Sequence, residues 1–144
     1  MSLTIKSIRV VAAVIQSDGK YLITQRRENA SLPLLWEFPG GRVEPGETDG
    51  AALQREFGER LGATVEVGKP VAFRRHDYEG YSVELVLYEA TLHTPDGLEP
   101  KRVKEYRWVA ADEFSQYPFP PADRHTLDDF QLFVGAKNKK PPTA

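Results

Sequence analysis

The chain has 144 residues, of which 40% are hydrophobic and 28% are charged, as is typical of a single globular domain with its own core. Its formal net charge of −2 gives no bulk electrostatic basis for binding nucleic acid or an anionic membrane, so neither is expected as a partner. The absence of cysteine excludes disulfide bonds and zinc–thiolate sites.

Targeting segments are not evident in the sequence. No apolar run approaches the roughly 20 residues that are needed to span a bilayer. Residues 1–10 lack the uninterrupted apolar core of a signal peptide. We therefore expect a cytoplasmic protein.

Two apolar runs near the N-terminus, residues 8–15 (IRVVAAVI) and 21–24 (YLIT), flank the segment SDGK at residues 17–20. Asp-Gly between apolar runs is a strong turn signal, so we expect the two runs to pair as a hairpin. Residues 28–35 are predicted to form a loop.

Arg26 and Arg27 stand between this strand and that loop. One interpretation is a solvated strand end. The other is a guanidinium that contacts phosphate, for which its planar set of donors is suited.

The sequence from residue 48 to 62 predicts an amphipathic helix. Thr48 or Asp49 suits the N-cap position, and Gly62 suits the position just after the helix. Gly50 and Gly58 weaken the helix, so tertiary packing must hold it. The apolar residues recur every fourth position and form one stripe: Leu53, Phe57 and Leu61.

Two carboxylates lie beside that stripe. At about 100° per residue, Glu56 and Glu59 are roughly 60° apart on the helix surface, so both can point at one spot. Such a pair suits Mg²⁺, which binds through one or two carboxylates plus substrate phosphates. Gly40 and Gly41 permit backbone geometry that is closed to other residues, which lets a main-chain carbonyl approach the metal.

The rest of the chain alternates short strands and turns. Residues 64–67 and 71–75 read as one or two strands, interrupted around Pro70. Residues 82–91 alternate apolar side chains on one face with Glu84, Val86 and Tyr88 on the other, and residues 106–109 give a last strand.

The C-terminal part is predicted to contain a closing helix and a disordered tail. Leu127, Phe130 and Val134 have helical spacing, and residues 136–144 are basic and proline-rich. Strands interleaved with two helices indicate an α+β or α/β sandwich. We expect one domain over residues 1–135 and a disordered tail over 136–144.

The segment from residue 41 to 63 resembles the Nudix box, G-x5-E-x7-R-E-U-x-E-E-x-G-U, where U is a bulky aliphatic residue. Phe57 and Ala63 fill the two U positions loosely, and Arg60 stands where the family carries its last glutamate. The residues that match fixed positions are Gly41, Glu47, Arg55, Glu56, Glu59 and Gly62.

The resemblance implies the Nudix fold, an α/β/α sandwich with a mixed β-sheet between helices, and hydrolysis of nucleoside diphosphates linked to another moiety. Glu56 and Glu59 would bind Mg²⁺ or Mn²⁺ together with a carbonyl of Gly40 or Gly41. Arg55 would orient a carboxylate. Glu47 would brace the loop against the helix, although an ordinary structural salt bridge with Arg55 is an equally open interpretation.

Two departures from the family bear on catalysis. Arg60 brings positive charge where a third carboxylate is usual, so it either weakens metal binding or contacts a phosphate. Relatives that hydrolyse triphosphates often carry a further glutamate near the place of residues 101–104 (KRVK). Glu99 and Glu105 are the nearest substitutes, and we interpret both as surface charges.

The segments WEFPGG and YPFPPAD resemble the MutT-like and CTP-pyrophosphohydrolase-like branch, whose members cleave nucleoside triphosphates to the monophosphate and pyrophosphate. The resemblance implies that Arg26 contacts the substrate, that Asp123 bonds the base edge with a tilt towards cytidine, and that Phe38 lies near the base. Asp123 is equally open to interpretation as a helix N-cap, and Phe38 as a core residue.

Alternative functions remain open. Tyr78 and Tyr81 would stack on a second base if the substrate were ADP-ribose, a dinucleoside polyphosphate or capped RNA. Arg60 and the missing glutamate would fit a catalytically weak nucleotide-binding module. The sequence leaves monomer and homodimer open. No role in metal binding or catalysis is expected for three scattered histidines: His76, His93 and His125.

Overall fold

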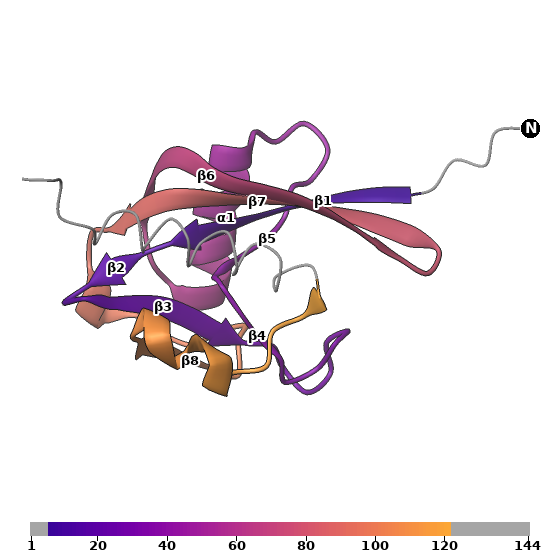
Figure 1. Ribbon diagram of the computed structural model, residues 1–144. Helices are drawn as coiled ribbons and strands as arrows, with labels where there is room; N and C mark the ends of the chain where they lie inside the picture. The colour runs from indigo at the N-terminus through magenta and orange to yellow at the C-terminus, as the bar shows by residue number, and fades with distance from the viewer. Residues whose placement is uncertain (1–5, 122–144) are drawn as a thin grey trace, which may run out of the picture.

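The computed structural model describes residues 6–121, in which two small sheets lie against helix α1 (Figure 1). Asp123, His125, the closing helix predicted around residues 127–134 and the tail at 136–144 lie outside the described residues. The elements in chain order are β1 (Lys6–Val14), β2 (Gln16–Ser17), β3 (Lys20–Gln25), β4 (Trp36–Glu37), β5 (Gly40–Arg42), α1 (Asp49–Leu61), β6 (Val65–Tyr78), β7 (Tyr81–Leu92), η1 (Pro95–Gly97), β8 (Glu105–Val109) and η2 (Ala111–Gln116).

The first sheet has the strand order β5-β1-β7-β6 and is mixed. Strand β1 runs parallel to β7, with Val11 opposite Val86, and antiparallel to β5. In the second sheet β3 lies between β8 and the short strands β2 and β4, as Figure 1 shows below the first sheet. A mixed sheet beside a helix confirms the predicted α+β class.

The predicted N-terminal hairpin is wrong in its pairing. The Asp-Gly turn exists, with positive φ angles of 51° at Asp18 and 76° at Gly19, but it joins β3 to the short β2 and not to β1. Strand β1 belongs to the other sheet because its second half is buried, from Val11 to Val14. Strand β1 pairs with β5 on one edge and with β7 on the other, and both partners are distant from it in sequence.

The strands downstream of the helix follow the predicted pattern with one change. Strand β6 continues through Pro70 as a single strand, and its register against β7 shifts on either side of that proline. Proline is tolerated at such irregularities because it cannot donate to the ladder. Figure 1 shows the hairpin formed by β6 and β7 extending away from the body of the molecule.

Helix α1 has the predicted ends. The Thr48 hydroxyl accepts a hydrogen bond from the Ala51 amide at 3.1 Å, and Gly62 ends the helix in the left-handed conformation with φ of 62°. Arg9 of β1 forms two hydrogen bonds to Asp49, at 2.8 and 2.7 Å, which attach the start of the helix to the first sheet.

The core lies on both sides of the first sheet. Leu53, Phe57 and Leu61 of α1 pack with Val11 and Val86 on one side. Phe38 and Phe114 pack with strand residues on the other. Among residues 6–121, no helix is long and apolar enough to cross a membrane.

The two helix glycines give a matched stability prediction. Gly62→Ala should lower the free energy of unfolding by about 1 kcal/mol, because an L-residue is strained in the left-handed region. Gly58→Ala should raise it by about 0.5–1 kcal/mol, because Gly58 is inside the helix and a Cβ there meets open space. Urea unfolding of both variants checks the opposite signs, and equal effects would contradict this account of the cap.

Candidate active site

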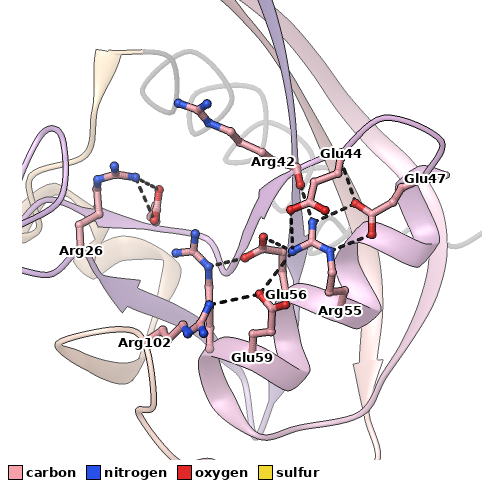
Figure 2. A network of polar contacts seen from close by, with 10 residues as sticks. Arg26, Arg42, Glu44, Glu47, Arg55, Glu56, Glu59 and Arg102 are labelled. Carbon is pink, nitrogen blue, oxygen red and sulfur yellow. Dashed lines mark hydrogen bonds and ion pairs between the residues drawn. The ribbon is translucent and has the colours of Figure 1, made fainter.

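Arg55 is the centre of a polar network that ties α1 to the segment before it (Figure 2). Its Nε lies 2.8 Å from a Glu47 oxygen, and its Nη2 donates to the other Glu47 oxygen at 2.9 Å. The same Nη2 donates to the Arg42 carbonyl at 2.8 Å. The two-pronged contact suits the planar guanidinium, so Arg55 fixes the helix against β5 and the turn that carries Glu47.

Arg55 also holds the two glutamates of the helix. Its Nη1 lies 2.8 Å from Glu56 Oε1 and 3.4 Å from Glu59 Oε2. Because both carboxylates contact one nitrogen, they face the same spot beside the helix, as the helical spacing predicts. They differ in burial, since the side chain of Glu56 is 8% exposed and that of Glu59 is 41% exposed.

Each of these carboxylates has a second arginine. The Arg60 Nε donates to Glu56 Oε2, and Arg102 Nη1 lies 3.6 Å from Glu59 Oε2. The Arg60 carbonyl also accepts hydrogen bonds from the amides of Lys101, at 2.9 Å, and Arg102, at 3.2 Å. The basic loop after β7 is thereby attached to the end of α1, next to the glutamates.

Positions 40 and 41 have no room for a side chain, so only glycine fits there. The left-handed conformation that glycine permits is not used at these two positions, since the glycines with positive φ among residues 6–121 are Gly19, Gly46, Gly62 and Gly80. A Cβ at Gly40 would overlap the Val11 carbonyl, and one at Gly41 would overlap the Glu56 carboxyl group. The main chain of β5 therefore lies directly against the buried glutamate.

Two adjoining pockets open at this place. The charged pocket is lined by five arginines and three glutamates: Arg26, Arg27, Arg55, Arg60, Arg102, Glu44, Glu56 and Glu59. The second pocket, called the apolar pocket after its aromatic and aliphatic residues, is lined in part by Phe38, Tyr78, Tyr81, Val83 and Leu85 and includes Gly40 and Gly41. Charged residues line it as well: Arg26, Glu37, Arg42 and Arg60. Arg26 and Arg60 line both pockets, so they stand at the boundary between them.

Glu37 is a site residue that the sequence did not reveal. Its carboxylate lies 3.2 Å from Arg26 Nη1, and it lines the apolar pocket. Burial raises the pKa of the Glu37 carboxyl, although Arg26 and Arg60 nearby act in the opposite direction. The available signal was an acidic residue between two large aromatics, Trp36 and Phe38, which are both buried.

Arg26 is not a solvated strand end. Besides Glu37, its guanidinium contacts the Ser31 carbonyl at 2.7 Å and the Ser31 hydroxyl at 3.1 Å, so the loop after β3 holds it over the pockets.

A model of the NUDIX domain family matches residues 10–129 of the chain. The chain belongs to the Nudix hydrolase family. The chain is 38% identical over 135 residues to the CTP pyrophosphohydrolase of Escherichia coli (strain K12), spanning 92% of this chain and 97% of that protein. It is 32% identical over 131 residues to the nucleoside triphosphatase NudI of Salmonella arizonae, spanning 82% and 92%. The solution structure of the E. coli ORF135 protein superposes with a TM-score of 0.79 and 36% identity, covering 94% of this chain and 96% of that one.

The other residues singled out in this Nudix chain have clear positions. Phe38 is buried against the rings of Phe114 and Phe119 and also lines the apolar pocket, so the two interpretations of it are compatible. The rings of Tyr78 and Tyr81 stack on each other with centroids 5.1 Å apart. Glu105 pairs with Arg107 at 2.7 Å, and neither Glu99 nor Glu105 is among the residues that line the charged pocket.

The donor set suits a hard divalent ion that takes part of its ligands from the substrate. Among the described residues, no three acidic, histidine or cysteine side chains gather as a metal cluster. Glu56 and Glu59 still supply two carboxylates beside one another, and Mg²⁺ needs no more from the protein when phosphates and waters complete the sphere. Nudix hydrolases generally use a divalent metal, and these two glutamates are the residues that would hold it.

The Glu47–Arg55 contact predicts a pH-dependent contribution to stability. The hydrogen bond from Arg55 lowers the pKa of Glu47 from 4.5 to about 2. The ionised form therefore stabilises the folded state above pH 4.5, and this contribution is lost as the pH falls from 4.5 towards 2.

Glu47→Gln should thus lower the urea midpoint at pH 7, and its difference from the wild type should shrink at pH 3. Glu79→Gln, in the exposed turn between β6 and β7, is the matched control. A Glu47→Gln effect that is the same at both pH values would contradict the assigned ion pair.

Proposed function

We propose that this Nudix hydrolase is a Mg²⁺- or Mn²⁺-dependent pyrophosphohydrolase that cleaves nucleoside triphosphates to the monophosphate and pyrophosphate, and that it works in the cytoplasm. The observation that carries the proposal is the pair of adjoining pockets. One has aromatic and aliphatic side chains together with Arg26, Arg42, Arg60 and Glu37, and the other is lined mainly by arginines and glutamates. A nucleotide has the same two halves, a flat base and a polyanionic chain.

Residues of the two pockets would bind different parts of the nucleotide. The base would lie against Phe38 and the Tyr78–Tyr81 pair, because aromatic rings bind flat bases by stacking. Arg26 and Arg60 stand where the first phosphates after the ribose would pass. Arg102 lies further along, beside Glu59.

Arg55 and Glu47 act as positioning residues, because their contacts run to the glutamates and to the backbone of β5. Water attacks one phosphorus of the bridge between the α- and β-phosphates, a new phosphorus–oxygen bond forms, and the bridging bond breaks to release pyrophosphate. A bound divalent ion would neutralise the charge that develops on the phosphate oxygens. The residues that would hold it are Glu56 and Glu59, with a carbonyl of Gly40 or Gly41.

The substrate class draws support from the named relatives, which are a CTP pyrophosphohydrolase and a nucleoside triphosphatase. Asp123, which lies outside the described residues, favours cytidine nucleotides as substrates. A carboxylate there would accept a hydrogen bond from the exocyclic amine of cytosine.

A panel of substrates tests the proposal. The pure protein should convert a (d)NTP, with cytidine nucleotides or modified bases favoured, to the monophosphate and pyrophosphate in Mg²⁺ or Mn²⁺, as seen by ³¹P NMR. Faster turnover of ADP-ribose or diadenosine polyphosphates would favour the alternative in which the substrate carries a second base or sugar beyond the phosphates. Nucleotide binding without any turnover would favour a binding module.

Glu59→Gln should abolish metal-dependent turnover, with a loss on the order of a hundredfold or more, because a carboxylate that would hold the metal is removed. Glu99→Gln, which lies outside the charged pocket, should retain wild-type turnover. Thermal unfolding should show both variants folded, since Glu59 is exposed. Wild-type activity in Glu59→Gln would refute the assignment of the metal ligands.

A further inference from the structure

The charged pocket carries an excess of positive side chains before any metal binds. Five arginines and three glutamates line it, whereas the whole chain has a net charge of −2. A site that relied on metal ions alone to attract a polyphosphate would not need this excess. The local charge therefore favours an anionic ligand in its own right.

Arg60 is the arginine of this pocket that contacts the buried Glu56 and also lines the apolar pocket. It occupies one oxygen of the buried Glu56, while Arg55 occupies the other. Two guanidiniums thus share a carboxylate that would hold the divalent ion. Arg55 cannot leave easily, since it is also fixed by Glu47 and by the Arg42 carbonyl.

The position of Arg60 gives it a second possible partner. Its side chain is 32% exposed and lines both pockets, whereas Arg102 is 65% exposed and is among the residues of the charged pocket alone. The main chain of Arg60 is fixed by the amides of Lys101 and Arg102. The guanidinium can therefore turn from Glu56 towards a phosphate at the boundary of the pockets without movement of the helix.

We propose that Arg60 is a built-in cation of this site, which pairs with Glu56 when the site is empty of nucleotide and binds a phosphate of the nucleotide when it arrives. The inference rests on the proposed function for the identity of the ligand. Two consequences follow. The protein binds polyphosphate without a divalent ion, and Arg60 competes with the divalent ion for Glu56 until nucleotide draws the arginine away.

Calorimetry in EDTA tests the first consequence, with inorganic tripolyphosphate and a non-hydrolysable nucleoside triphosphate analogue as ligands. The wild type should bind both, and R60Q should bind about tenfold more weakly, the effect expected for one charge-assisted hydrogen bond. R102Q removes the same charge from the same pocket and should weaken the nucleotide analogue less. R75Q removes the same charge from outside both pockets and should bind as the wild type does.

Electron paramagnetic resonance of free Mn²⁺ tests the second consequence on nucleotide-free protein. R60Q should bind Mn²⁺ several-fold more tightly than the wild type, because Glu56 loses a competing guanidinium. R60E, which places the family's usual residue type at this position, should bind Mn²⁺ at least as tightly as R60Q and should lose metal-free polyphosphate binding. Circular dichroism checks that each variant is folded. If R60Q does not fold, R60E is compared with the wild type in its place.

Three results would overturn the proposal: equal polyphosphate affinity in R60Q and the wild type, equal losses in R60Q and R102Q for the nucleotide analogue, or unchanged Mn²⁺ affinity in R60Q. These results are separable from failure of the proposed function. If the wild type hydrolyses no nucleoside triphosphate with Mg²⁺ or Mn²⁺, the hydrolase proposal fails while the binding measurements still decide the role of Arg60.

Discussion

The site depends on one side chain, the guanidinium of Arg55. It contacts Glu47, Glu56 and Glu59 and also donates to the backbone of β5, so a single planar group sets the distance between helix and strand and the direction of two carboxylates. Carboxylates this close together repel one another unless a cation lies between them. The guanidinium of Arg55 is that cation, and it keeps the two carboxylates next to each other before any metal is bound.

The surrounding structure serves the same arrangement. Glycines 40 and 41 allow the main chain of β5 to pass directly against Glu56, because any Cβ would collide with Val11 or with the carboxylate itself. The apolar stripe of α1 fixes the helix in the core, and the basic loop after β7 is attached to the last turn of the helix through the Arg60 carbonyl. The result is a Nudix site in which Arg55, Arg60 and Arg102 pair with the box glutamates.

Local signals in the sequence were sufficient to predict the helix, both of its caps, the Asp-Gly turn and the common direction of Glu56 and Glu59. These features depend on residues within one or two turns of each other. The pairing of β1 with β7 was not predictable in this way, because the partner lies some 75 positions further along the chain. Glu37 was missed because its partner Arg26 lies 11 positions earlier in the chain, and the loop after β3 that holds Arg26 in place is not predictable from local patterns. The spacing of Glu56 and Arg60 showed that they are neighbours, but only the structure showed them paired.

A crystal structure with Mg²⁺ and a non-hydrolysable nucleoside triphosphate analogue tests the central claim most directly. The account predicts a divalent ion bound by Glu56 and Glu59 and bridging to the phosphates, the base in the apolar pocket, and Arg55 still in contact with Glu47. It would be contradicted by a nucleotide bound elsewhere, with both glutamates engaged only by arginines.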